Sequence, residues 1–177
     1  MASALSDKNI WSFGPTTVAH WNGHVLTRTS VKKLLIKQTE FNDPQLVGIY
    51  AQSKDNIWAI GSGHTQDAGG PIFILHGNGH GWRRVVVGPL GSDGGQSVAP
   101  DGRGGLWIPL NGASGQPTTI AHFSGGKLTT VKLPVAGRQL TVSSIALVPG
   151  TTEAIAGGFT HSDTFTNIVG VILQYSP

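Results

Sequence analysis

Residues 55–61 read Asp-Asn-Ile-Trp-Ala-Ile-Gly, and related stretches recur about every 48 residues along the chain. The large apolar residue at the centre of each copy is separated from the next by 47, 49 and 48 residues, at Trp11, Trp58, Trp107 and Ile155. A second stretch follows each copy and reads Val-Ala-His-Trp-Asn-Gly at 18–23, Ile-Leu-His-Gly-Asn-Gly at 74–79, Ile-Ala-His-Phe-Ser-Gly-Gly at 120–126 and Ile-Leu-Gln-Tyr at 172–175. A repeat of short strands at this period is typical of stacked blades.

Each repeat divides into strand-like runs separated by Gly, Pro, Asn, Asp and Ser. The second repeat predicts strands at 46–51, 56–61, 72–76 and 82–87, and the third at 96–99, 105–110, 119–123 and 127–133. The second run is apolar on both sides, since Ile57 and Ala59 face one way and Trp58 and Ile60 the other. A sheet that is apolar on both faces is expected to lie between two neighbours.

These patterns predict an all-β chain, a β-propeller-like array of four blade repeats in a single domain over residues 1–177. The approximate blades are 1–44, 45–92, 93–138 and 139–177. The chain opens with only a stub of a first strand and stops at the third strand of the last repeat, so the last blade lacks its outer strand. Residues 31–37 are interpreted as an outer strand with its connector. The array closes within one chain, closes between two chains, or belongs to a larger propeller.

Composition fits a turn-rich β-protein, with 38% hydrophobic and 12% charged residues, 26 Gly and 10 Pro. The net charge of +3 is scattered, which argues against a nucleic-acid partner. The absence of cysteine excludes disulfides and thiolate chemistry. No run approaches the roughly 18 apolar residues of a membrane span, and residues 1–6 lack the features of a signal peptide.

The stretches at 56–61 and 19–23 resemble the Ile-Trp-Ala-Val-Gly and His-Trp-Asn-Gly motifs of a family of bacterial repeat proteins with kelch-like and galactose-oxidase-like propellers. The resemblance covers nearly the whole chain, although the fourth repeat departs from it at Ile155 and Gln174. It implies a propeller fold and a secreted or extracytoplasmic location. The motifs specify a blade and no reaction.

Three histidines recur at one repeat position, at His20, His76 and His122. On the third strand of each blade they would lie about 10 Å outward from the first strand, too far apart to share a metal ion that needs each imidazole at about 2.1 Å. We expect a structural role, with each ring bonded to backbone or to a neighbouring blade. The tryptophans at 11, 58 and 107 are expected to pack between blades. We predict no metal, no cofactor and no catalytic residue.

The expected function is a non-catalytic binding or scaffold module that presents inter-strand loops to a protein or glycan partner. The loops at 61–70, 111–117 and 158–167 differ most between repeats and are where specificity could reside. The candidate binding residues are His64, Asp67, His161 and Asp163 in these loops, with Trp21 and Trp82 beside turns.

Two alternatives stay open. A hydrolase or lyase would bind its ligand at the propeller axis, lined by first-strand residues such as Tyr50, Gln52, Gln96, Ser97, Ser143 and Ser144. A structural assembly module would instead self-associate through the unpaired edge of the last blade.

Overall fold

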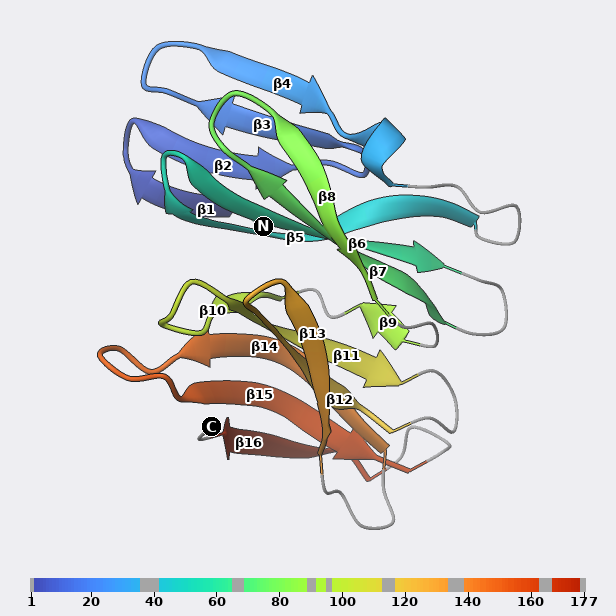
Figure 1. Cartoon of the computed structure of the whole chain (residues 1–177). Helices are drawn as coiled ribbons and strands as arrows, with labels where there is room; N and C mark the ends of the chain where they lie inside the picture. Colours follow the sequence, from blue (N-terminus) through green and yellow to red (C-terminus); the bar gives the residue numbers. More distant parts are fainter. Residues whose placement is uncertain are drawn as a thin grey trace. The chain divides into compact units, whose positions relative to one another are not determined.

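The computed structural model describes residues 2–35, 42–64, 69–88, 92–94, 97–112, 117–133, 139–162 and 167–175. In these ranges every regular element is a β-strand except one 3-10 helix, Lys32–Leu34 (Figure 1). None of the described residues forms a helix long and apolar enough to cross a membrane.

The first two sheets each contain four antiparallel strands in sequence order. The first sheet consists of β1 (Ala2–Ser6), β2 (Asn9–Phe13), β3 (Thr17–Trp21) and β4 (Leu26–Ser30). The second consists of β5 (Asn42–Ser53), β6 (Asn56–His64), β7 (Gly69–Gly77) and β8 (Trp82–Val87).

The third sheet has the same order, with its first position shared by two short strands that pair with successive parts of β11. It consists of β9 (Ser92–Gly94), β10 (Ala99–Pro100), β11 (Leu106–Gly112), β12 (Thr119–Ser124) and β13 (Lys127–Lys132). The fourth sheet contains β14 (Gln139–Leu147), β15 (Ala154–His161) and β16 (Val169–Tyr175). The fold is therefore an all-β array of four blade-like sheets, and the last has three strands in the described part of the chain.

The 48-residue repeat of the sequence is a repeat of strand register. Trp11 pairs with His20, Trp58 with His76 and Trp107 with His122 across the second and third strands of their sheets. Ile155 and Gln174 form the same pair in the fourth sheet. A given position of the sequence repeat therefore has the same cross-strand register in each of the four sheets.

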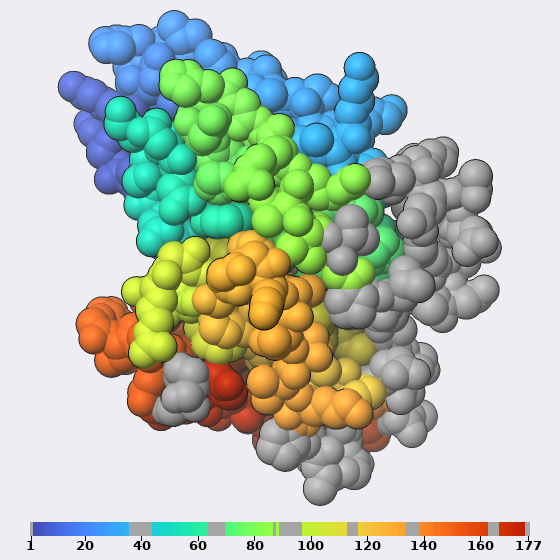
Figure 2. All heavy atoms as spheres, in the orientation of Figure 1, coloured from blue at the N-terminus to red at the C-terminus, as the bar shows by residue number. Residues whose placement is uncertain are grey.

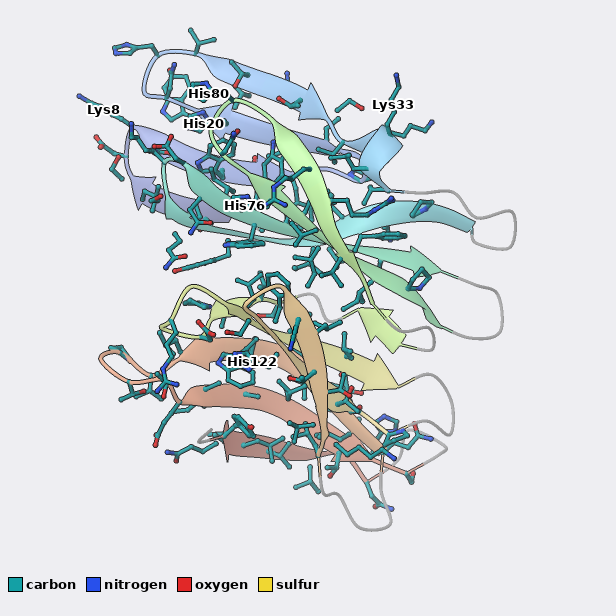
Figure 3. The ribbon with its side chains drawn as sticks, viewed as in Figure 1. Lys8, His20, Lys33, His76, His80 and His122 are labelled. Atoms are coloured by element: carbon teal, nitrogen blue, oxygen red, sulfur yellow. The ribbon has the colours of Figure 1, made fainter. Side chains whose placement is uncertain are left out.

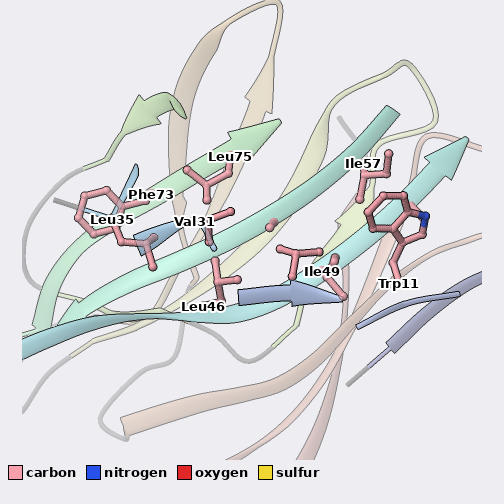
Figure 4. Close-up of a cluster of buried hydrophobic side chains, with 11 residues drawn as sticks. Trp11, Val31, Leu35, Leu46, Ile49, Ile57, Phe73 and Leu75 are labelled. Carbon is pink, nitrogen blue, oxygen red and sulfur yellow. The ribbon is translucent and has the colours of Figure 1, made fainter. Parts of the chain in front are cut away.

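The chain divides into two compact units, Met1–Leu90 and Gly91–Pro177, each holding two sheets. In the first unit, Trp11 and Val18 of the first sheet share a core with Ile49, Ile57 and Leu75 of the second (Figure 4). In the second unit the corresponding core joins three residues of the third sheet, Ala99, Trp107 and Ile120, to five of the fourth, Leu140, Val142, Ile145, Ala154 and Ala156. The Trp-bearing face of one sheet therefore packs on the following sheet in both units.

A serine hydroxyl that accepts the backbone N–H of a first strand on the neighbouring sheet also recurs in the two units. The amide N–H of Ala51 donates to Oγ of Ser3 at 2.9 Å, and the N–H of Ile145 donates to Oγ of Ser97 at 3.1 Å. Both pairs are 48 residues apart. The serine satisfies a backbone donor that the neighbouring sheet would otherwise bury unpaired.

Three details of the predicted strands are wrong. In place of a first strand at 96–99, the third sheet has β9 and β10, and residues 97 and 98 belong to neither. The N-terminus is more than a stub, because Ala2–Ser6 pairs with β2 as a complete first strand. The outer strand of the first sheet is Leu26–Ser30, and the following residues form the 3-10 helix instead. Val31 and Leu35 are buried in the core while Lys32 and Lys33 are exposed, a spacing that one helical turn satisfies and a strand does not. Closure of the four sheets into one domain stays a prediction.

Candidate functional site

Each of the first three sheets holds a tryptophan, the histidine opposite it and a side-chain oxygen acceptor, which together we call the Trp-His-Asx cluster. In the first sheet the ring of His20 stacks on Trp11 with centroids 3.9 Å apart, and Oδ1 of Asn9 lies 2.9 Å from the indole Nε1 and 3.0 Å from Nε2 of His20. In the second sheet the ring centroids of His76 and Trp58 are 4.5 Å apart. Nε2 of His76 lies 3.0 Å from Oδ1 of Asn56.

The third cluster uses a different acceptor. His122 stacks on Trp107 at 3.9 Å, and its Nε2 lies 2.9 Å from Oδ2 of Asp101. Gly105 stands where the first two repeats have asparagine, two residues before the tryptophan. A Cβ there would clash with the Asp101 carboxylate and the carbonyl oxygen of Phe123, so only glycine leaves room for the aspartate.

Asp101 is almost fully buried, and its carboxylate has three hydrogen-bond partners. Besides His122, the amide N–H groups of Arg103 and Gly105 each donate to its Oδ1 at 2.7 Å. Burial alone would raise the pKa of Asp101, but the hydrogen bonds from His122, Arg103 and Gly105 outweigh it and hold the pKa below its usual 3.8. The carboxylate therefore stays ionised inside the sheet.

The fourth sheet keeps the polar contact without the aromatic pair. Gln174 replaces the histidine, and its Nε2 donates to Oε2 of Glu153 at 2.7 Å. Glu153 lies two residues before Ile155, the spacing that Asn9 and Asn56 have to their tryptophans. Ile155 itself is 40% exposed.

The recurring histidines are thus part of the sheets, but their partners differ from the prediction of backbone or a neighbouring blade. The partner is an Asn or Asp side chain on the same sheet, because the cross-strand register places the imidazole over the tryptophan with Nε2 toward the start of the second strand. Across the described ranges, no three His, Cys, Asp or Glu residues lie together as a metal site would require.

Two of these histidines make stability depend on pH. Burial lowers the pKa of His20 and His76 from the usual 6.5, and the charge of Arg83 lowers that of His76 further. The unfolded chain therefore binds these protons more readily, so the rings contribute their full stability above about pH 6.5 and progressively less as the pH falls through their folded-state pKa values.

We expect the urea midpoint of the chain to drop between about pH 7.5 and pH 5.5, and to drop less in the double variant His20→Gln/His76→Gln. Glutamine is the matched replacement because Gln174 fills the same register position. The other histidines are present in both proteins, so parallel pH curves would contradict the account.

The β7–β8 hairpin carries a hollow on the first unit. Its volume is about 380 Å³, within the range of roughly 300–1,000 Å³ that ligand pockets occupy. Its lining combines a cation, an aromatic ring, two imidazoles and an amide, from His76, Asn78, His80, Gly81, Trp82 and Arg83. Figure 3 shows His76 and His80 on this hairpin, and Figure 2 shows the hairpin atoms, in green, on the surface of the unit.

The hairpin is held in place by its own turn and by its neighbours. Oδ1 of Asn78 accepts the N–H of His80 at 3.1 Å and that of Gly81 at 2.9 Å. The indole of Trp82 lies against Gly77, in the space that a Cβ at that residue would occupy. It also meets the ring of Trp11 edge-on, with ring centroids 6.2 Å apart. The side chains of the hollow therefore stand on a fixed support.

Two further hollows adjoin hairpin turns. One of about 50 Å³ lies between the first two sheets, beside Trp11, His20 and Trp82, and is large enough for a water but not a sugar. The other, of about 680 Å³, lies in the second unit beside turns that include Arg103, Thr151 and Glu153. Its charges are of opposite sign, so it favours no single ligand class.

The predicted binding residues do not form one cluster. His64 ends β6, but its side chain lies outside the described residues, as do Asp67 and Asp163 entirely. His161 is buried at the end of β15, with its Nδ1 2.8 Å from the carbonyl oxygen of Ser162. Trp21 ends β3 and Trp82 begins β8.

Of these six residues, Trp82 lines the hollows just described. Sequence reasoning did not select its partners His80 and Arg83, although a tryptophan followed by arginine directly after an Asn-Gly turn was the available signal. The Asn and Asp acceptors were missed as well. The recurrence of Asn9 and Asn56 at the start of β2 and β6 could have identified these two, whereas Asp101 lies at a different position of the repeat.

Comparisons with known proteins add little to this picture. No protein-family model matches the chain, and no curated protein does either. Among solved structures, it is similar to a chain from a structural and mechanistic analysis of two prolyl endopeptidases, with a TM-score of 0.48 and 11% identity. The match covers 96% of this chain and 25% of the other, so this chain spans about a quarter of its length. Likeness at this level carries no argument about function.

Proposed function

We propose that the chain is a non-catalytic binding module that presents the β7–β8 hairpin to a glycan or protein partner. The observation that carries the proposal is the hollow lined by Trp82, Arg83, His80 and Asn78. Indole faces and planar guanidinium groups are the side chains that most often dominate recognition surfaces. A rigid support also lowers the entropy lost on binding.

The finer family assignment is part of this proposal. The Ile-Trp-Ala-Ile-Gly stretch lies on β6, and the His-Trp-Asn-Gly stretch ends β3 and enters its turn, which supports membership among the bacterial kelch-like and galactose-oxidase-like repeats. An extracytoplasmic location rests on that resemblance. The hydrolase alternative stays a prediction. Among the residues proposed for that alternative, Ser97 accepts, through its hydroxyl oxygen, a hydrogen bond from a backbone N–H of the neighbouring sheet.

A matched pair of variants tests the binding role. We expect the chain to bind a subset of a glycan or peptide array, Trp82→Ala to lose that binding, and Trp21→Ala to keep it. Trp21 is the control because it also stands at a strand end beside an Asn-Gly turn, outside the described hollows. Circular dichroism checks that both variants fold. Binding to neither array, or equal loss in both variants, would overturn the proposal.

A second candidate, self-association, is favoured by the fourth sheet. The outer edge of β16, opposite its partner β15, has no further partner strand among the described residues, and Ile172 is 81% exposed. An open edge with exposed apolar side chains is a template for pairing. Light scattering at micromolar concentration tests this candidate, and a strict monomer would contradict it.

A further inference from the structure

We propose that the fourth sheet of one chain packs face to face on the first sheet of a second copy of this chain. This surface is separate from the hairpin hollow and from the open edge of β16, which would pair strands through backbone groups. In both units a sheet packs its Trp-bearing face on the following sheet. The fourth and the first sheet each expose one half of such a contact.

The fourth sheet has an apolar face opposite its core. Ala156 and Leu173 pack in that core. Side chains alternate along a strand, so Ile155 and Ile172 lie on the opposite face. They are 40% and 81% exposed. Repeat arrays usually cover a face that stays in solvent with polar side chains. Exposed isoleucines on two adjacent strands therefore indicate a face that another sheet covers.

The same residue types are buried at the same register positions of the third sheet. Ile172 occupies the position of Ile120. Ala146, which is exposed, occupies the position of Ala99. In the third sheet Ile120 is 3% exposed and Ala99 is 2% exposed, because both lie in the core with Trp107. The exposed face of the fourth sheet is thus the counterpart of a face that packs on a following sheet.

The first sheet carries the receiving half of the contact. Ala4 pairs with Ile10 on the face opposite Trp11. The same pair of residue types, Ala51 and Ile57, recurs at this position of the second sheet. Ala51 is 4% exposed and Ile57 is fully buried, since both pack in the core that Trp11 enters. Ala4 is instead exposed and Ile10 is partly exposed. The first sheet therefore repeats a face that the second sheet buries.

An aromatic position strengthens this match. Tyr175 of the fourth sheet meets Trp107 of the third, with ring centroids 4.9 Å apart. Trp21 holds the register position of Tyr175 and lies on the same face of the first sheet as Ile10. Its side chain is partly exposed. We therefore expect Trp21 to pack against Ile155 of the second copy, the residue at the position of Trp107.

A second copy is the occupant because the two matching faces belong to this chain. Contact between the fourth sheet of one copy and the first sheet of the next uses two different surfaces. Such a heterologous contact closes into a ring or extends into a filament. Pairing of two β16 edges would instead use one surface twice, which gives the two modes different responses to mutation.

The test uses two lysine variants and their mixture, measured by light scattering at micromolar concentration. We expect the native chain to form dimers or larger assemblies. Ile172→Lys and Ala4→Lys should each be monomeric, because burying an unpaired lysine should weaken the contact by about a hundredfold or more. Their equimolar mixture should form a heterodimer, since each variant keeps the face that the other has lost.

The control is Val25→Lys, which adds the same charge at a 56% exposed apolar residue between β3 and β4. It should associate as the native chain does. Circular dichroism checks that all variants fold, which we expect because Ile172 and Ala4 are exposed in one chain.

Each other outcome overturns the inference in a distinguishable way. A monomeric native chain overturns it in favour of closure within one chain or of a different protein partner. Assembly that persists in Ala4→Lys overturns it in favour of pairing through the β16 edge. Variants that stay monomeric when mixed indicate a symmetric contact. Equal loss in Val25→Lys shows a general effect of added charge. The substitutions lie outside the lining of the β7–β8 hollow, so the arrays decide the proposed function separately.

Discussion

Replacing Trp107 with alanine is expected to lower the free energy of unfolding by about 3–5 kcal/mol, the usual cost of removing a buried tryptophan. Trp107 is 1% exposed, stacks on His122 and meets Tyr175 of the next sheet with centroids 4.9 Å apart. Alanine would leave a cavity in the core between the third and fourth sheets. Urea denaturation with unchanged m-value is the measurement.

The fourth repeat supplies the control for that prediction. Ile155 occupies the equivalent register position, paired with Gln174, but it is 40% exposed. Ile155→Ala should therefore cost less than about 1 kcal/mol, as partly exposed positions usually do. Comparable losses in the two variants would mean that burial at this position does not follow the sheet packing described above.

Replacing Asp101 with alanine is expected to cost about 2–4 kcal/mol, because it leaves buried donors without their acceptor. The stranded groups are the amide N–H of Arg103, the N–H of Gly105 and the ring of His122. Asp55→Ala is the matched control, since Asp55 also precedes a second strand but is exposed, and it should change stability by less than about 0.5 kcal/mol.

Asp101→Asn separates shape from charge. Its amide oxygen can still accept the two backbone N–H groups, so it should be milder than alanine. Because the pKa of Asp101 lies below 3.8, the carboxylate stabilises the fold above that pH and loses this contribution as the pH falls through its folded-state pKa. The asparagine variant should therefore lose less stability on acidification than the native chain. An equal acid response in both proteins would contradict the assigned role.

The repeat explains how much of the fold follows from the sequence. The tryptophan spacing identified the second strands. That the sheet containing 56–61, apolar on both sides, lies between two neighbours stays a prediction. The three-stranded last sheet also follows from the phase of the repeat. These features are local, since strand pairing at a fixed period needs only the alternation of side chains and the turns between them.

Other features depend on what the chain brings together in space. The first strand, Ala2–Ser6, has small residues and no β-branched ones, and it is ordered by pairing with β2. The 3-10 helix after β4 is set by the core that Val31 and Leu35 enter. In the third sheet Asp101 is the acceptor where the first two sheets use an asparagine. This difference, and the hollow beside Trp82, depend on the placement of side chains in space, which the spacing of residues in the sequence does not give.

The central claim is that the Trp-bearing face of one sheet packs against the following sheet in each unit. The most direct test is a nuclear Overhauser measurement between aromatic rings far apart in sequence. We expect cross-peaks between Trp107 and Tyr175 and between Trp11 and Trp82, whose ring centroids lie 4.9 and 6.2 Å apart. Assigned spectra of the folded chain without these cross-peaks would contradict the account.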